Sequence, residues 1–305
     1  MISPPNLKTN DKVAIVCMAG KTTLDTIQPG IDLLVSWGLQ VVVGETVGAV
    51  DGVFGGDDEL RKNDFQKYLN DPTVKAIFSA RGGYGSTRFL DKIQWAKFKK
   101  NPKWVIGFSD ITAVLTKINN LGIVAIHGPM PKMLADIGGE TSAGELKKIL
   151  FGFETTYAAK PNESNKLGNC IAPIVGGNLC ILAHSIGSKS EINTDSKILF
   201  IEDVSEYFYN IDRMILQLKR AGKLKNLKGL IVGHFTDCKD SDNPFTTNNS
   251  LEKTIADIVR NHTQEYDFPI AFGVPIGHEP ENWPIICGKN VELVVNDWQV
   301  SLDFR

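Results

Sequence analysis

The sequence is poor in several features, each of which would mark a class of protein. Its 33 Lys and Arg side chains are nearly balanced by 35 Asp and Glu side chains, so the formal net charge is -2. This balance excludes a strongly basic protein that coats nucleic acid, and the hydrophobic content of 42% excludes wholesale disorder. No apolar run approaches the ~18 residues that a membrane helix needs. We therefore expect neither nucleic acid nor a membrane as a partner.

Targeting and metal-binding patterns are also missing. The first residues, MISPPNLKTNDK, contain no basic segment followed by an apolar one, and we expect no secretory signal. The five cysteines are scattered and none forms a C-x-x-C pair, which argues against a zinc site. We expect buried thiols in the reducing cytoplasm.

Glycine is the one residue type in excess, with 28 of 305 residues against a usual share of about 7%. A chain of this length can form one large or two medium domains. In the first half, helical patterns separate short apolar runs at 13–18, 39–45, 74–81, 103–109 and 123–130. Continuously apolar strands between helices indicate a parallel sheet covered on both faces. We predict an N-terminal α/β domain over residues 1–155.

The second half follows a polar, turn-rich segment, residues 156–167, that we interpret as a linker. Helical patterns that begin near residues 178, 211 and 251 alternate with apolar runs at 171–175, 196–204, 227–235 and 269–277. The closing sequence NVELVVNDWQVSLDF alternates apolar and polar residues, which predicts an antiparallel hairpin turning near residues 296–297. Residues 168–305 are predicted to form a second, mixed α/β domain.

Ser109 stands at the end of a predicted strand, where ligands bind in open parallel sheets. A serine between an apolar strand and a helix is how α/β hydrolases expose a nucleophile. The N–H of Asp110 would then face a developing oxyanion. The full G-x-S-x-G pattern is absent because position 111 is isoleucine. Ser109 is a candidate nucleophile, with a plain helix N-cap as the alternative.

The glycine-rich sequence RGGYGS (81–86) directly follows another predicted strand. Glycines there let the backbone approach a ligand and present N–H groups to an anion, so Gly83 is a candidate oxyanion donor. The spacing matches neither G-x-G-x-x-G nor a phosphate loop, and a tight structural turn is the alternative. Arg81 and Tyr84 in this segment are candidate substrate contacts.

A carboxylate and a histidine complete a possible catalytic set. Glu202 ends a strongly apolar strand and His278 follows another. With a serine they supply nucleophile, base and orienting carboxylate. His127 and His234 also follow apolar strands and compete for the base role, and His127 is a further candidate substrate contact. A solvated capping residue is the alternative for Glu202.

The motif GGNL (176–179) begins a predicted helix at Asn178. Free N–H groups at a helix N-terminus can hold an anionic group, such as the terminal carboxylate of a substrate. Asn178 is therefore a candidate substrate-binding residue, and a plain N-cap is the alternative.

Six motifs follow one another along nearly the whole chain: RGGYGS, IGFSDIT, HGPM, GGNL, FIEDVSEYFYNIDRMILQL and FGVPIGHEPEN. Together they resemble the LD-carboxypeptidases, serine peptidase family S66. The resemblance implies a flavodoxin-like N-terminal half with helices on both faces of a parallel sheet. It also implies a C-terminal mixed α/β half of swivelling or barrel-like form, and a homodimer.

The resemblance also implies roles for individual residues. By motif, Ser109 is the nucleophile, His278 the general base and Glu202 its partner. Gly83 and Asp110 are the oxyanion donors. The resemblance thereby selects one of the three competing histidines. The implied reaction is cytoplasmic hydrolysis of the bond between an L-centre and a terminal D-amino acid. Its typical substrate is the murein tetrapeptide of recycled cell wall, which loses D-alanine, and no metal or cofactor is implied.

Two other functions remain open at this point. A related branch of the family cleaves peptidyl-adenylate antibiotics and confers self-immunity, but the segment SEYFYNIDRM (205–214) resembles the carboxypeptidase branch more. A function of a different class is that of a non-catalytic two-domain protein whose glycine loops hold a small anionic ligand.

Overall fold

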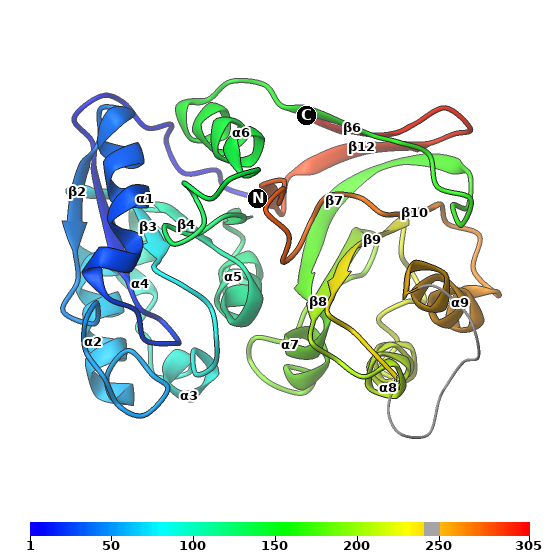
Figure 1. Cartoon of the computed structure of the whole chain (residues 1–305), viewed down its shortest axis with the longest axis horizontal. Coiled ribbons are helices and arrows are strands. Elements are labelled where there is room, and N and C mark those ends of the chain that lie inside the picture. Colours follow the sequence, from blue (N-terminus) through cyan, green and yellow to red (C-terminus); the bar gives the residue numbers. More distant parts are fainter. Residues whose placement is uncertain (241–250) are drawn as a thin grey trace. The chain divides into compact units, whose positions relative to one another are not determined.

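The computed structural model describes residues 1–240 and 251–305, and these form two compact units. The N-terminal unit contains Met1–Glu154 and Pro280–Gly288, and the C-terminal unit contains Thr155–Glu279 and Lys289–Arg305. Both units combine a sheet with helices (Figure 1). This is the α/β fold class that the sequence predicts.

The N-terminal unit is built on a six-stranded sheet in the order β11-β5-β4-β3-β1-β2. Its strands are β1 (Lys12–Val16), β2 (Gln40–Val43), β3 (Val74–Ser79), β4 (Trp104–Gly107), β5 (Ala125–His127) and β11 (Ile285–Cys287). The first five are parallel, and β11 pairs with β5 in the antiparallel direction. The order 2-1-3-4-5 of the parallel strands is the flavodoxin-like order.

Helices connect these parallel strands, and one more helix, α6, follows β5. They are α1 (Leu24–Ser36), α2 (Asp58–Asn70), α3 (Thr87–Leu90), α4 (Ala96–Lys100), a 3-10 turn η1 (Ser109–Ile111) with α5 (Thr112–Asn120), and α6 (Glu140–Phe151). The chain leaves β1 toward one edge, through α1 to β2, and then returns across β1 through α2 to β3. Because such crossovers are right-handed, α1 and α2 lie on opposite faces of the sheet.

The C-terminal unit has a seven-stranded mixed sheet in the order β10-β9-β8-β7-β12-β13-β6. Its strands are β6 (Thr156–Ala159), β7 (Gly168–Asn178), β8 (Ile198–Val204), β9 (Gly229–Thr236), β10 (Ile270–Phe272), β12 (Asn290–Val295) and β13 (Val300–Phe304). Strands β7 to β10 are parallel, whereas β12, β13 and β6 are antiparallel. The predicted C-terminal hairpin is β12–β13.

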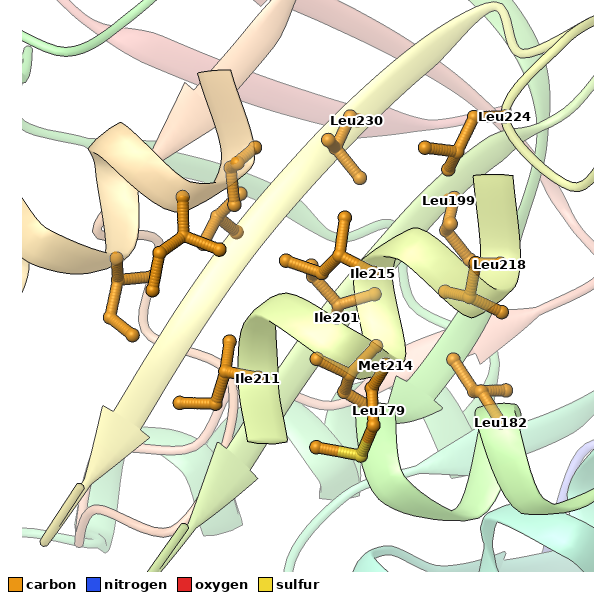
Figure 2. Packing of buried hydrophobic residues seen from close by; sticks show 14 of the residues in the cluster. Leu179, Leu182, Leu199, Ile201, Ile211, Met214, Ile215, Leu218, Leu224 and Leu230 are labelled. Atoms are coloured by element: carbon orange, nitrogen blue, oxygen red, sulfur yellow. The ribbon is translucent and has the colours of Figure 1, made fainter. Parts of the chain in front are cut away.

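One hydrophobic core joins the parallel strands of this unit to three helices, α7 (Leu179–His184), α8 (Phe208–Arg220) and α9 (Leu251–Thr263). Figure 2 shows its centre, where the labelled residues come from α7, β8, α8, the turn after α8, and β9: Leu179, Leu182, Leu199, Ile201, Ile211, Met214, Ile215, Leu218, Leu224 and Leu230. Leu199 and Ile201 are two positions apart on β8, so they share the face that the helices cover. The alternate residues, ending in Glu202, point to the other face.

The division of the chain differs from the sequence prediction in two respects. The segment predicted as a linker begins with β6, which pairs with β13, and Lys166 forms a bridge with Ile270. Residues 280–288 leave the C-terminal unit and add β11 to the N-terminal sheet. Both differences come from strands too short to carry a hydrophobic period.

Among the described residues, no helix combines the length and apolar character that crossing a bilayer requires.

Candidate active site

Ser109 occupies a strained turn between β4 and α5. Its φ angle is +63°, a left-handed conformation that costs energy for any residue with a side chain. Phe108 before it is extended, and the 3-10 turn η1 begins at Ser109 itself. A serine on such a strand-to-helix turn presents its hydroxyl above the sheet, as a nucleophile elbow does.

The sequence around Ser109 lacks the second glycine of G-x-S-x-G, and the packing explains why the turn still forms. A Cβ atom placed on Gly107 would lie 2.9 Å from Cγ2 of Ile111. The two positions that flank the serine therefore touch, and one glycine is enough to make room. Here the glycine stands before the serine and the bulky residue after it.

The glycine-rich loop after β3 lies against this turn. A Cβ atom on Gly82 would lie 2.9 Å from Cβ and 3.1 Å from Oγ of Ser109. The Gly20 N–H donates to the Gly82 carbonyl at 3.0 Å, and Gly83 has a φ angle of +109°. Only glycine allows the backbone this close to the serine hydroxyl in this conformation.

Asp110 is buried, and its side chain faces the same loop. Its carboxylate accepts the N–H of Ser86 at 2.8 Å and that of Gly85 at 3.3 Å. Burial raises the pKa of the Asp110 carboxyl, although these hydrogen bonds oppose the rise. The Asp110 N–H belongs to the first turn of a helix, where N–H groups have no partner within the helix.

In the C-terminal unit, Glu202 and His278 form a hydrogen-bonded pair. Oε2 of Glu202 lies 2.7 Å from Nδ1 of His278, and the Glu202 side chain is fully buried whereas that of His278 is 18% exposed. Burial lowers the pKa of His278, but the hydrogen bond to Glu202 and the surrounding carboxylates outweigh burial and raise it above its ordinary value. Orientation by a buried carboxylate is what a general-base histidine requires.

Gly277 makes room for this pair. Its φ angle is +137°, and a Cβ atom there would lie 3.2 Å from both Cβ and Oε2 of Glu202. Within the predicted strand-end sequence GHEPEN, the glycine thus lets the backbone before His278 pass directly over the carboxylate.

The Asp203 side chain points to the opposite face of the sheet from that of Glu202, where it binds the N-terminus of α7. Its carboxylate accepts the N–H of Cys180 at 2.9 Å and Nδ2 of Asn178 at 2.8 Å. The Asn178 side chain in turn accepts the N–H of Ile181. These groups are therefore not available to a substrate carboxylate, and Asn178 acts as the N-cap that the sequence offered as the alternative.

Burial and the charge of neighbouring Glu202 raise the pKa of Asp203 to about 7. In the sequence, Asp203 stands beside Glu202 at the end of the same apolar run, where a solvated capping residue is the alternative for both acids.

The other predicted substrate contacts, Arg81, Tyr84 and His127, differ in how far their side chains are exposed. Tyr84 is 53% exposed, and Arg81 donates to the Lys21 carbonyl at 3.0 Å. His127 is fully buried on β5 with its ring against Phe108. A direct contact between its imidazole and a substrate therefore does not fit this burial. Ser109 and its loop belong to the N-terminal unit, and Glu202 and His278 to the C-terminal unit.

Comparison with known proteins identifies both halves of the chain. Residues 13–128 match the LD-carboxypeptidase N-terminal domain and residues 172–293 match the LD-carboxypeptidase C-terminal domain. A probable murein peptide carboxypeptidase of Bacillus subtilis is 33% identical over 282 residues, which cover 90% of this chain and 86% of the relative. The chain belongs to the LD-carboxypeptidase family. It is therefore an enzyme of the carboxypeptidase class.

Solved structures of this fold agree with the assignment. Muramoyltetrapeptide carboxypeptidase from Oxalobacter formigenes superposes with a TM-score of 0.84 at 26% identity, covering 96% of this chain and 98% of that one. The microcin C7 self-immunity protein MccF, in complex with aspartyl sulfamoyl adenosine, gives a TM-score of 0.87 at 19% identity, covering 100% and 99%. The second likeness shows a shared fold only.

Proposed function

We propose that this LD-carboxypeptidase hydrolyses the peptide bond between an L-centre and a C-terminal D-amino acid. The proposed substrate is a murein tetrapeptide, which is cleaved to a tripeptide and D-alanine. The observation that carries the proposal is the left-handed Ser109 with the glycine loop packed on its hydroxyl. The names of the relatives and the order of the motifs support the substrate class.

In the proposed first step, Ser109 Oγ attacks the carbonyl carbon of the scissile bond. His278, through its Nε2, takes the serine proton, while Glu202 holds Nδ1 and stabilises the imidazolium. The carbonyl oxygen becomes an oxyanion that the N–H groups of Gly83 and Asp110 would hold. His278 then gives the proton to the leaving amine, and D-alanine departs from the acyl-enzyme.

In the second step, a water molecule attacks the acyl-enzyme and gives one proton to His278. The tetrahedral intermediate collapses, and the proton passes back to Ser109. The products are the tripeptide carboxylate and the free enzyme. Tyr84, exposed beside the glycine loop, and Arg81 are the proposed substrate contacts outside the catalytic set.

The test is mass spectrometry of murein tetrapeptide incubated with wild type and with Ser109→Ala. We expect D-alanine release by wild type and a loss of at least about 10³-fold in Ser109→Ala. The melting temperature should stay within a few degrees, because the half-buried hydroxyl carries little packing. Turnover retained by Ser109→Ala would overturn the proposal.

Two further measurements distinguish the other two functions. An aspartyl sulfamoyl adenosine that is cleaved faster than the tetrapeptide would indicate an immunity-type peptidase. Thermal stabilisation by the tetrapeptide without any turnover would indicate a binding protein.

We also propose a cytoplasmic homodimer. None of the five cysteines forms a disulfide, which is usual for proteins of a reducing compartment. Burial raises the pKa of Cys17 and Cys287 to about 12, so these thiols are unreactive at neutral pH. Light scattering of the purified chain tests the dimer, and a monomer mass at micromolar concentration would exclude it.

A further inference from the structure

A buried arginine lies beneath the glycine loop of the N-terminal unit. Arg61 of α2 has no exposed surface, although a charged side chain is almost never fully buried without partners. Its Nη1 donates to the Gly85 carbonyl at 2.8 Å and its Nε to the Gly56 carbonyl at 3.1 Å. Its Nη2 donates to Asp58. The guanidinium N–H groups thus donate to backbone carbonyls and to one carboxylate.

The loop is pressed onto this guanidinium. A Cβ atom on Gly85 would lie 2.6 Å from Nη1 of Arg61 and 2.9 Å from the Phe54 ring. The guanidinium carbon lies 4.7 Å from the centre of the Phe54 ring and 5.5 Å from that of Phe89. Arg61 therefore limits how closely the backbone at Gly85 can approach α2.

Asp110 fixes the other side of the same residues. Its carboxylate accepts the N–H groups of Gly85 and Ser86, and the Ser86 hydroxyl donates to the Asp110 carbonyl at 2.9 Å. Gly85 is thereby held through its carbonyl by Arg61 and through its N–H by Asp110. We call this arrangement of Arg61, Gly85, Ser86 and Asp110 the loop clamp.

The loop clamp ties together the two proposed oxyanion donors. One donor is the backbone N–H of Asp110, and the other is that of Gly83, two residues before the clamped Gly85. The residue before Gly83 is held as well, because the Gly82 carbonyl accepts the N–H of Gly20. Hydrogen bonds thus hold both ends of the segment from Gly82 to Gly85. In the proposed oxyanion hole, Asp110 would supply its main-chain N–H, and its side chain would position the second donor.

Stability does not explain why two charged groups are buried here. Hydrophobic residues of similar volume are often as stabilising as a buried ion pair or more so.

We propose that Arg61 and Asp110 are positioning residues that hold the Gly83 N–H in place for the oxyanion. The proposal rests on the proposed function. Removing one oxyanion donor from a hydrolase costs about 10²- to 10³-fold in kcat. Loosening a donor without deleting it should cost up to that amount. Substrate binding in the ground state should be little changed.

The main test compares Asp110→Asn with wild type on the tetrapeptide. The amide keeps the shape but can accept only one of the two N–H groups. We expect kcat to fall about 10- to 10³-fold while KM changes less than about 3-fold. A peptide boronic acid, with boron at the position of the scissile carbonyl, forms a tetrahedral adduct with the serine. Its affinity should fall by the same factor as kcat/KM.

The matched control is Asp64→Asn. Asp64, on α2, is another buried carboxylate of the N-terminal unit. Asp64 accepts the N–H and hydroxyl of Thr46 at 2.9 and 2.7 Å, and it has no part in the loop clamp. This variant should lose thermal stability but keep the wild-type kcat and boronate affinity. Arg61→Lys, which keeps the charge but not the fork of donors, should lie between wild type and Asp110→Asn.

A wild-type kcat in folded Asp110→Asn, or a raised KM with unchanged kcat, would overturn the positioning role while leaving the proposed function intact. Turnover that survives Ser109→Ala would overturn both. If Asp110→Asn does not fold, Ser86→Ala decides the question, because it removes only the hydroxyl bond to the Asp110 carbonyl. A fall in kcat of about 2- to 10-fold is then expected, and an unchanged kcat contradicts the loop clamp.

Discussion

At the scale of single residues, two acidic residues share one arrangement. Asp110 follows the candidate nucleophile and Asp203 follows the candidate orienting carboxylate. Each is buried and accepts backbone N–H groups from a neighbouring segment: Asp110 from the glycine loop and Asp203 from the start of α7. In each unit, the residue next to a candidate catalytic side chain thus holds a neighbouring backbone segment in place.

The raised pKa of His278 gives a prediction for the pH dependence. The base must be neutral, so kcat/KM rises with pH as His278 loses its proton, with a midpoint above the ordinary 6.5. Glu202→Gln removes the partner that raises the pKa, whereas burial remains. We expect the midpoint to move to lower pH than in wild type and kcat/KM to fall about 10²- to 10⁴-fold. The pH–rate profile and NMR titration of the imidazole measure both.

Asp203, whose pKa is about 7, titrates in the same range and needs its own control. In Asp203→Asn the rising limb should persist because His278 is still present. Its midpoint should lie at a somewhat lower pH, since Asp203 is one of the carboxylates that raise the pKa of His278. If the rising limb of the pH–rate profile disappears in this variant, the limb reports the titration of Asp203 and not that of His278. The contribution of His278 to stability changes with pH in the opposite direction to its contribution to activity. Since the folded pKa of His278 is raised, its stabilising contribution is complete below the unfolded pKa and is lost as pH rises through the folded pKa.

At the scale of elements, the serine turn depends on the contact between Gly107 and Ile111. Gly107→Ala places a methyl group 2.9 Å from the isoleucine, and overpacking of this kind costs about 1–3 kcal/mol. We expect a lower free energy of unfolding and a lower kcat. In a double-mutant cycle with Ile111→Gly, which moves the glycine to the second flanking position, the two changes should couple by about 0.5–3 kcal/mol.

The control for this cycle is Gly144→Ala in α6. A Cβ atom there meets nothing within 4 Å, and alanine is favoured over glycine inside a helix by roughly 0.5–1 kcal/mol. Urea denaturation should show this variant to be as stable as wild type or more stable. Additive effects of Gly107→Ala and Ile111→Gly would show that the contact does not restrict the turn.

The sequence predicted most elements because their signals are local. The apolar strands β4, just before Ser109, and β8, which contains Glu202, are such continuous runs. Asp57 directly precedes α2, where its carboxylate accepts the N–H of Leu60. Arg61 was missed because a charged residue in an amphipathic helix is normally on the surface. Strand β11 was missed because three residues carry no period, and only pairing with β5 makes them a strand.

The candidate site shows the same limit. Residue types and strand ends suggested Ser109, Glu202 and three competing histidines, and only the family resemblance favoured His278. The hydrogen bond between His278 and Glu202 depends on the close passage of Gly277, which no local pattern contains.

At the scale of the whole molecule, the N-terminal unit is discontinuous in sequence. Residues 1–154 alone would leave β5 at the edge of the sheet, paired with β4 on one side and without its β11 partners on the other. Unpaired, apolar edge strands promote aggregation. We predict that a fragment of residues 1–154 is insoluble or binds hydrophobic dyes. The same fragment, continued through a Gly/Ser linker into residues 280–288, should unfold cooperatively in urea.

Two outcomes would contradict this prediction. A soluble fragment 1–154 with a cooperative transition would show that β11 is dispensable. Failure of the rejoined chain, at equal expression, would show that the N-terminal unit needs more than its own residues.

The position of β11 also bears on how the protein is made. Domains of a nascent chain generally fold as units, the N-terminal one first, at synthesis rates of about 5–20 residues per second. Here the first unit cannot complete its sheet until Ile285–Cys287 has been translated, after residues 155–279 of the second unit have been made. The unfinished edge of β5 is therefore exposed throughout translation of the second unit, a period in which a chaperone that binds apolar strands would find a substrate.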